Sequence, residues 1–193
     1  MPNETSAEEA PLVSIICRTI GRAELEKTLN SISKQTHPNV ELVLVDAGVE
    51  VESFYTADIT RTLPVDGKFS PAQRALYMLV YESQLAGFAA IKPGVLFSEI
   101  NKACQAVLAK GLADMGVLTV SAEESLKPEI GLHRRWTLHG VSHMLGMDVH
   151  DCAHARAEQY RDGVLEVGMC LTVEPGLYIQ PDDELFPVEY RGI

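Results

Sequence analysis

The sequence has little positive charge. It contains 16 lysine and arginine residues against 27 aspartate and glutamate residues, a formal net charge of −11. Binding to nucleic acid or to an anionic membrane needs a basic patch, so neither partner is expected. No apolar run approaches the roughly 18 residues that would span a bilayer. The acidic residues 1–10 also lack the basic start and apolar stretch of a secretion signal, so a cytoplasmic location is expected.

Cysteine is scarce as well. The chain has four cysteines, far apart and without a Cys-x-x-Cys pair, which excludes a zinc knuckle and a dithiol redox motif. A chain of 193 residues that is 46% apolar can build a core without disulfides. We therefore expect Cys17, Cys104, Cys152 and Cys170 to be reduced, mostly buried thiols, as in an intracellular protein.

The N-terminal quarter has the pattern of a βαβ unit. Residues 1–10 are expected to be a disordered leader. Residues 12–17 and 41–46 are short aliphatic runs typical of buried strands. Between them, residues 22–33 place leucine and isoleucine side chains on one helical face. Residues 11–48 therefore predict strand, helix and strand in that order.

Two later segments are rich in residues that favour strands. Residues 49–65 carry aromatic residues, isoleucine and threonine, which predicts two antiparallel strands with Asp58 on the second. Residues 169–179 are apolar on both sides of Glu174 and are also expected to be extended.

Two helices are expected between these segments. Ser70 followed by Pro71 is typical of a helix start, and helical spacing of apolar residues continues toward Lys92. Ser98 is expected to cap a second helix that ends near Gly111. The chain thus alternates between strand and helix.

Asp46, Asp58, His143 and Glu174 are the residues most suited to bind a divalent cation. Each has a simpler explanation when taken alone, because Asp46 could end a strand and Asp58 could pair with a nearby arginine. Glu174 lies within an apolar strand, so it needs a cation or an ion-pair partner.

A second pattern joins His139 and His143. Four residues apart, they would share one face of a helix. The segment lacks the glutamate of His-Glu-x-x-His, so a zincin-type site is not expected.

Read together, these positions resemble the pita-bread metallopeptidases, in particular aminopeptidase P and the related prolidases. The resemblance rests on residues 46–64, 139–151 and 171–179, which match the successive motifs of that family in the same order. It covers residues 46–193 and implies an α+β fold, a partial pita-bread core that follows the βαβ unit.

The family resemblance also implies a metal site and a reaction. Two divalent ions (Mn, Co or Zn) would share a hydroxide that attacks the peptide bond before proline and releases the N-terminal residue. Asp46 would bind one ion, Asp58 both, and His143 and Glu174 the other. This arrangement is physically reasonable, because bridging carboxylates offset the repulsion between two nearby cations.

Further roles follow from the same resemblance. His139 and His150 would face the proline-containing peptide and stabilise charge on the reacting carbonyl. Glu174 would also transfer protons.

The chain departs from that family at both ends. The family's last ligand, a second bridging glutamate, would follow Ile193, so metal binding and catalysis are expected to be impaired unless Asp182, Asp183 or Glu184 replaces it. The family's earlier half, with its own histidine, has no counterpart in residues 1–45. An incomplete domain would expose an unpaired sheet edge, so self-association is expected.

Residues 11–48 instead resemble the opening of family 2 glycosyltransferases, in which Asp46 would hold the nucleotide of a sugar donor. Ala47 stands where that family has a second acid, and no Asp-x-Asp follows. Three interpretations remain open at this point: an impaired Xaa-Pro aminopeptidase, an inactive fragment or chimera that acts as a binding module, and a nucleotide-sugar binding unit.

Overall fold

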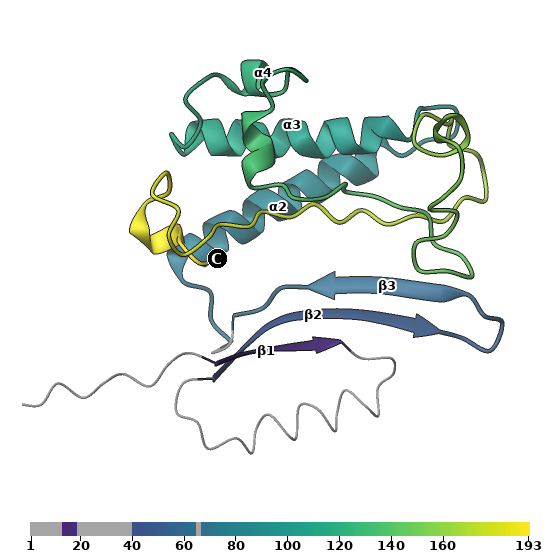
Figure 1. The fold of residues 1–193 in the computed structure, drawn as a ribbon, viewed down its shortest axis with the longest axis horizontal. Coiled ribbons are helices and arrows are strands. Elements are labelled where there is room, and N and C mark those ends of the chain that lie inside the picture. Colours follow the sequence, from purple (N-terminus) through teal and green to yellow (C-terminus); the bar gives the residue numbers. More distant parts are fainter. Residues whose placement is uncertain (1–12, 19–39, 65–66) are drawn as a thin grey trace, which may run out of the picture.

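A three-stranded sheet forms the first layer of the molecule. The computed structural model describes residues 13–18, 40–64 and 67–193, with the backbone alone at 13–18 and 40–47. Strand β1 (Val13–Arg18) pairs parallel to β2 (Val40–Glu50), and β2 pairs antiparallel to β3 (Thr56–Arg61) (Figure 1). The parallel pairing of β1 with β2 is the one expected for residues 11–48. The two strands expected within residues 49–65 are wrong, because that segment holds only β3 and the antiparallel partner of β3 is the longer β2. The leader and the helix expected at 22–33 lie outside the described residues.

Strand β3 presents two different faces. Thr56, Asp58 and Thr60 are partly buried, whereas the side chains that alternate with them are exposed. Because successive side chains of a strand point to opposite faces, this pattern directs Asp58 toward the body of the molecule. The backbone N–H and the side-chain hydroxyl of Thr56 both donate to the carbonyl of Gly146, which attaches β3 to a distant loop.

Two long helices form the second layer. Helix α2 (Pro71–Ala90) starts as expected, and the Ser70 hydroxyl and the Gln73 side chain form a reciprocal capping box. Helix α3 (Ser98–Asp114) starts differently, because its N-cap is Phe97 and Ser98 is already the first helical residue. The prediction that Ser98 caps this helix is therefore wrong. Here the N–H groups of Glu99 and Ile100 donate to backbone carbonyls at residues 96 and 97.

Helices α2 and α3 pack closely along their length. Ser83 and Cys104 exchange side-chain to backbone hydrogen bonds between the two helices. A Cβ added to Gly87 would lie 2.6 Å from both Cys104 Sγ and a methyl group of Val173. Cys104 is buried as expected, but Cys152 and Cys170 are exposed. The expectation of mostly buried thiols therefore fails at those two positions, which lie in loop segments.

Within the described residues, four short helical turns complete the set of helices and strands. They are α4 (Ala122–Ser125), η1 (Leu132–Arg135), η2 (Ala157–Gln159) and η3 (Val188–Tyr190). In the described part of the chain, no helix has the length and apolar character required to cross a membrane.

The segments that carry the histidines and Glu174 run as extended chain between the helices and the sheet (Figure 1). Residues 139–143 are not helical, so the shared helix face expected for His139 and His143 is wrong. Residues 169–179 are extended, but they make one isolated bridge, from Leu171 to Met144, rather than a continuous strand. Backbone hydrogen bonds at 141–145 pair the two segments antiparallel up to Glu174, where Pro175 interrupts the ladder.

Two apolar clusters support this arrangement. One contains Trp136, Ile179 and Phe186 beside both helices. The other contains Val141 and Val173 with residues of α3, including Ile100. Leu171 and Val173 pack into this second cluster, and Thr172 and Glu174, which alternate with them along the extended segment, belong to the candidate site. One face of residues 171–174 therefore packs into the core, and the other faces His143 and, through it, Asp58 of β3.

Candidate metal centre

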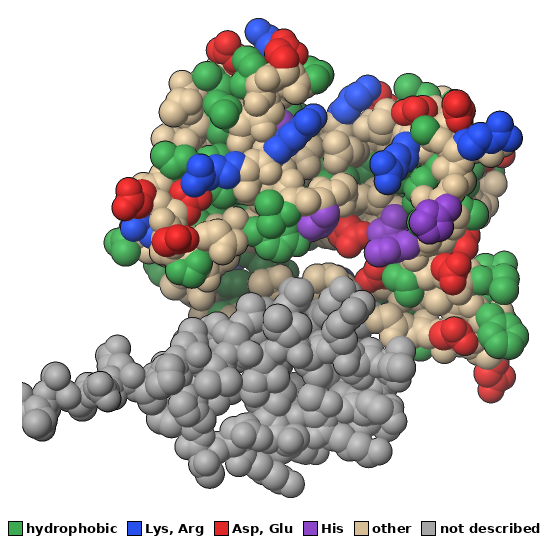
Figure 2. Space-filling view, viewed as in Figure 1, with side chains coloured by type: hydrophobic (Ala, Val, Ile, Leu, Met, Phe, Trp, Pro, Cys, Tyr) green, Lys and Arg blue, Asp and Glu red, His purple; other side chains and the backbone are tan. Residues whose placement is uncertain are grey.

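His143 is the centre of a cluster drawn from three separate segments. Its Nε2 atom lies 2.8 Å from Glu174 Oε1 and 3.2 Å from Asp58 Oδ2. The three side chains are largely buried, with 15% of His143, 30% of Glu174 and 11% of Asp58 exposed. Figure 2 shows histidine and acidic side chains gathered on one face of the molecule, near the strand hairpin.

The hydrogen bonds of His143 define which ring nitrogen can act as a ligand. Nδ1 lies 3.0 Å from the carbonyl of Met144, and a carbonyl only accepts, so Nδ1 carries the proton. Nε2 is then the nitrogen left to bind either a cation or a second proton. This atom is buried and makes no hydrogen bond, although two carboxylates lie close to it. A lone pair between two carboxylates is unfavourable unless a cation or proton lies among them, so the donors fit a divalent cation.

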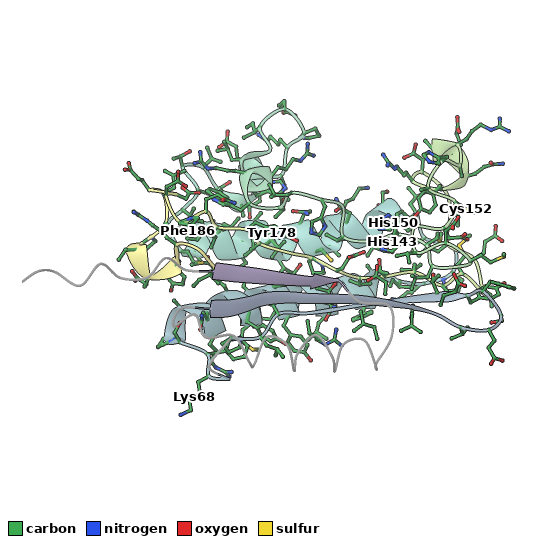
Figure 3. All side chains as sticks on the ribbon, turned by 60° about the horizontal axis from the view of Figure 1, so that its bottom comes forward. Lys68, His143, His150, Cys152, Tyr178 and Phe186 are labelled. Atoms are coloured by element: carbon green, nitrogen blue, oxygen red, sulfur yellow. The ribbon has the colours of Figure 1, made fainter. Side chains whose placement is uncertain are left out.

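His150 approaches the same cluster from the loop after residue 146. Its ring lies 4.4 Å from that of His143, centroid to centroid, in an edge-on arrangement (Figure 3). One potential ligand atom from each of Asp58, His143 and His150 lies within 4.8 Å of the other two. Among the described residues this is the only group of three with that spacing. Glu174 contacts His143 but is not part of it.

Thr172 positions two members of the cluster and was missed by sequence reasoning. Its hydroxyl accepts from the backbone N–H of His143 at 3.1 Å and donates to Glu174 Oε1 at 2.7 Å. The only signal in the sequence is a hydroxyl residue two positions before Glu174, and therefore on the same face of an extended chain. Gln84 of α2 also holds this segment, because its amide donates to the carbonyl of Val173 at 2.7 Å.

His139 lies outside this cluster. Its Nε2 is 2.6 Å from the hydroxyl of Tyr178, and its Nδ1 is 2.8 Å from the carbonyl of Gly140. Because a carbonyl only accepts, Nδ1 carries the proton and Nε2 accepts from Tyr178. The exposed ring is therefore held in one orientation by two contacts. Tyr178 was not identified from the sequence, where it reads as one more apolar strand residue.

Two other candidates lie at different places in the fold. Asp46 sits opposite Thr60 in the β2–β3 register, while Asp58 sits opposite Gly48, so the two aspartates are diagonal neighbours along the backbone. The side chain of Asp46 lies outside the described part. Asp183 is buried and accepts from Trp136 Nε1 at 2.7 Å, so it belongs to a separate cluster and does not replace a ligand beside His143.

Comparisons with known proteins give a consistent result. The model of metallopeptidase family M24 matches residues 17–192, which include most of the segment 11–48. The chain is 56% identical over 153 residues to Xaa-Pro aminopeptidase 1 of Streptomyces coelicolor, covering 79% of this chain and 31% of that protein. It is 44% identical to Xaa-Pro aminopeptidase of Escherichia coli, covering 79% of this chain and 33% of that protein.

Solved structures show the same likeness. A zinc-substituted aminopeptidase P of Escherichia coli in complex with product matches 78% of this chain and 33% of that one, with 44% identity and a TM-score of 0.70. Aminopeptidase PepP of Pseudomonas aeruginosa matches 85% of this chain and 38% of that one, with 38% identity and a TM-score of 0.72. The chain thus spans about a third of the length of these relatives.

Proposed function

Because this chain belongs to metallopeptidase family M24, we propose that it carries the metal-dependent chemistry of an Xaa-Pro aminopeptidase, the release of an N-terminal residue that precedes proline. Family membership and the aminopeptidase P structures confirm the resemblance to pita-bread metallopeptidases and the partial α+β core. One observation carries the proposal: the buried Nε2 of His143 has no hydrogen bond and lies between two carboxylates.

The proposed ligands are Asp46, Asp58, His143 and Glu174, with manganese, cobalt or zinc as the ions. Imidazole and carboxylate donors are the types that such borderline cations prefer. A divalent ion bound there lowers the pKa of a water molecule and so supplies a nucleophile near neutral pH. Asp58 is suited to bridging two ions because its side chain is only 11% exposed and its carboxylate offers two oxygens.

The remaining roles belong to side chains that would face the peptide. His139 is held by Tyr178, so its ring is oriented toward a fixed position rather than rotating freely. His150 lies edge-on to His143 and is exposed, which allows it to contact both the site and a bound peptide. Glu174 uses Oε1 to accept from Thr172, and its second oxygen remains able to take up a proton from the attacking water.

The proposal is tested by manganese titration calorimetry on the purified chain, with hydrolysis of an Ala-Pro peptide measured in parallel. His143→Ala and Asp58→Asn are expected to lower manganese affinity at least tenfold, because each removes a donor from the cluster. The matched control is His154→Ala, an exposed histidine of the same loop region that is not among the grouped donors. Equal affinity in all four proteins would contradict the metal site.

The outcome of the same experiment separates the other functional interpretations. Metal binding with turnover supports an aminopeptidase, while metal binding without turnover supports an inactive relative that acts as a binding module. Nucleotide-sugar binding by residues 11–48 is the weaker candidate, because the M24 match starts within that segment at Cys17. A cytoplasmic location is also proposed, since Cys104, Cys152 and Cys170 are free thiols.

A further inference from the structure

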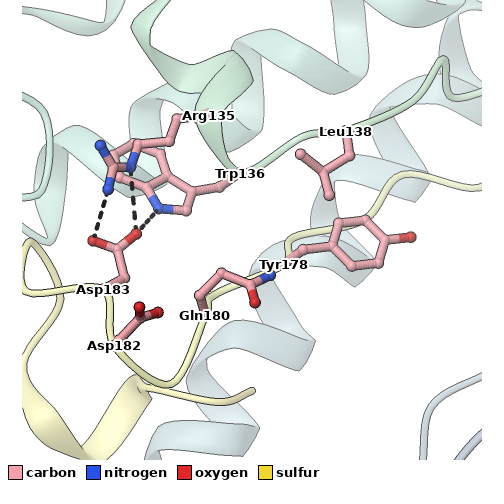
Figure 4. A pocket seen from close by; sticks show the side chains of 7 residues that line it. All are labelled: Arg135, Trp136, Leu138, Tyr178, Gln180, Asp182 and Asp183. Atoms are coloured by element: carbon pink, nitrogen blue, oxygen red, sulfur yellow. Dashed lines mark hydrogen bonds and ion pairs between the residues drawn. The ribbon is translucent and has the colours of Figure 1, made fainter.

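A small cavity has Tyr178 in its lining. Its volume is about 240 Å³, and Trp136, Leu138 and Tyr178 form its apolar wall (Figure 4). The Tyr178 hydroxyl contacts His139, so this cavity adjoins the part of the site proposed to face a peptide. Pockets for drug-sized ligands usually exceed about 300 Å³. This one has room for a single amino-acid side chain.

Two charges at one end of the cavity already neutralise each other. Asp183 accepts from Trp136 Nε1 at 2.7 Å and from the N–H of Leu185 at 3.1 Å, and Arg135 Nε lies 3.4 Å from Asp183 Oδ2. Burial alone would raise the pKa of Asp183, but these hydrogen bonds and the arginine charge outweigh it, so the pKa is lowered. Asp183 is therefore ionised at neutral pH and compensates Arg135.

Asp182 differs from its neighbour. It is exposed and lines the cavity, and it makes no hydrogen bond or ion pair within the described part of the chain. The cavity therefore carries one uncompensated negative charge. In the lining of the same cavity, the side chains of Leu138 and Tyr178 are 64% and 40% exposed. A long aliphatic stem that ends in a cation matches this combination of apolar wall and free carboxylate.

We propose that this cavity binds the side chain of a lysine or arginine in the peptide held at the candidate metal centre. The aliphatic stem packs against Leu138 and Tyr178, and the cationic end pairs with Asp182. That the basic residue belongs to a peptide substrate rests on the proposed function. The preference of the cavity for a cation does not, because it follows from Asp182 and its neighbours alone.

The sequence provides a direct probe of this cavity. Trp136 is the only tryptophan of the chain, so its indole N–H gives one resonance in a ¹⁵N-labelled sample. Metal-free protein is titrated with N-acetyl-lysine methylamide, and with the norleucine and glutamate analogues as uncharged and anionic controls. The lysine probe is expected to shift the indole resonance saturably. An exposed ion pair contributes modestly, so its affinity is expected to exceed that of norleucine by about two- to fivefold.

Two variants assign the effect to one carboxylate. Asp182→Asn is expected to remove the advantage of lysine over norleucine, and Glu184→Gln, an exposed neighbour outside the cavity lining, is expected to preserve it. Equal affinity for the three probes, or an advantage that survives in Asp182→Asn, would overturn the proposal. No metal and no turnover are involved, so an inactive protein with a lysine-selective cavity would refute only the proposed function.

Discussion

Thr172 connects two candidate ligands through one hydroxyl group. Replacing it with valine leaves the buried N–H of His143 without its acceptor and Glu174 without its donor. We expect Thr172→Val to lower the free energy of unfolding by about 1–3 kcal/mol and manganese affinity by about tenfold. Urea unfolding and calorimetry measure the two effects. Thr172→Ser retains the hydroxyl, and a loss of affinity as large as in the valine variant would show that the hydroxyl is not responsible.

His133 makes folding sensitive to acid. The residue is buried, and both its ring and its backbone N–H contact Ser125. Burial lowers the pKa of His133, although the hydrogen bond with Ser125 partly opposes this. The folded state therefore binds a proton less readily than the unfolded state, so stability is complete above about pH 6.5 and falls as the pH decreases.

Urea unfolding between pH 8 and pH 5 tests this dependence. The wild-type chain is expected to lose stability steadily below about pH 6.5, and His133→Gln, which cannot titrate, is expected to show a flatter profile over the same range. Identical pH profiles would assign the acid sensitivity to other groups.

The sequence identified Glu174 because an acid inside an apolar strand requires a partner. It identified Asp58 and His143 because their residue types suit a divalent cation and because they lie within motifs that resemble those of a metallopeptidase family. It could not identify Thr172 or Tyr178. Their roles depend on which segments lie side by side, and neither residue type is unusual in a strand. Nor could it relate Asp182 to Trp136, because a cavity arises from packing between segments far apart in the chain.

At the scale of elements, the sequence correctly predicted features that depend only on residues within one helical turn. The Ser70–Pro71 start of α2 is confirmed because a cap and an N-terminal proline act within one turn. Ser98 was misassigned because backbone carbonyls at 96 and 97 meet the first amides of α3 instead. The spacing of His139 and His143 suggested a helix, but pairing with residues 170–174 keeps that segment extended. Hydrogen bonding between distant segments, and not the local spacing of the histidines, determined the backbone conformation there.

Gly87 sets the distance between α2 and α3. We expect Gly87→Ala to destabilise the fold by about 1–3 kcal/mol, because the added methyl group overlaps Cys104 and Val173. At an exposed helical site the same change would stabilise by about 1 kcal/mol. Chemical unfolding of Gly87→Ala, Cys104→Ala and the double variant tests the mechanism. The double variant is expected to lose less than the sum of the two single losses, and strict additivity would argue against this contact.

At the scale of the whole molecule, the β2–β3 hairpin carries much exposed apolar surface. Phe54, Tyr55, Ile59 and Leu63 each expose more than half of their area, from 55% for Ile59 to 64% for Leu63. Such a surface beside a strand edge favours association of chains, which stays a prediction of the sequence. A net charge of −11 opposes that association at low ionic strength.

Size-exclusion chromatography at several salt concentrations tests whether apolar association or charge repulsion dominates. We expect larger species to increase with salt, and Ile59→Lys to reduce them, since Ile59 points away from the candidate metal centre. Val167→Lys, at an 89% exposed residue outside the hairpin, serves as the control. A monomer at every salt concentration would contradict the expected self-association.

The attachment of β3 to the loop at Gly146 joins residues 90 positions apart in the chain. A cation held by Asp58 and His143 would close the same long loop, and so act on the chain as a cross-link does. Binding of that cation and packing of the β2–β3 hairpin against the loop at Gly146 are then coupled equilibria. Every change that loosens the hairpin weakens the apparent metal affinity, even at residues that never touch the ion.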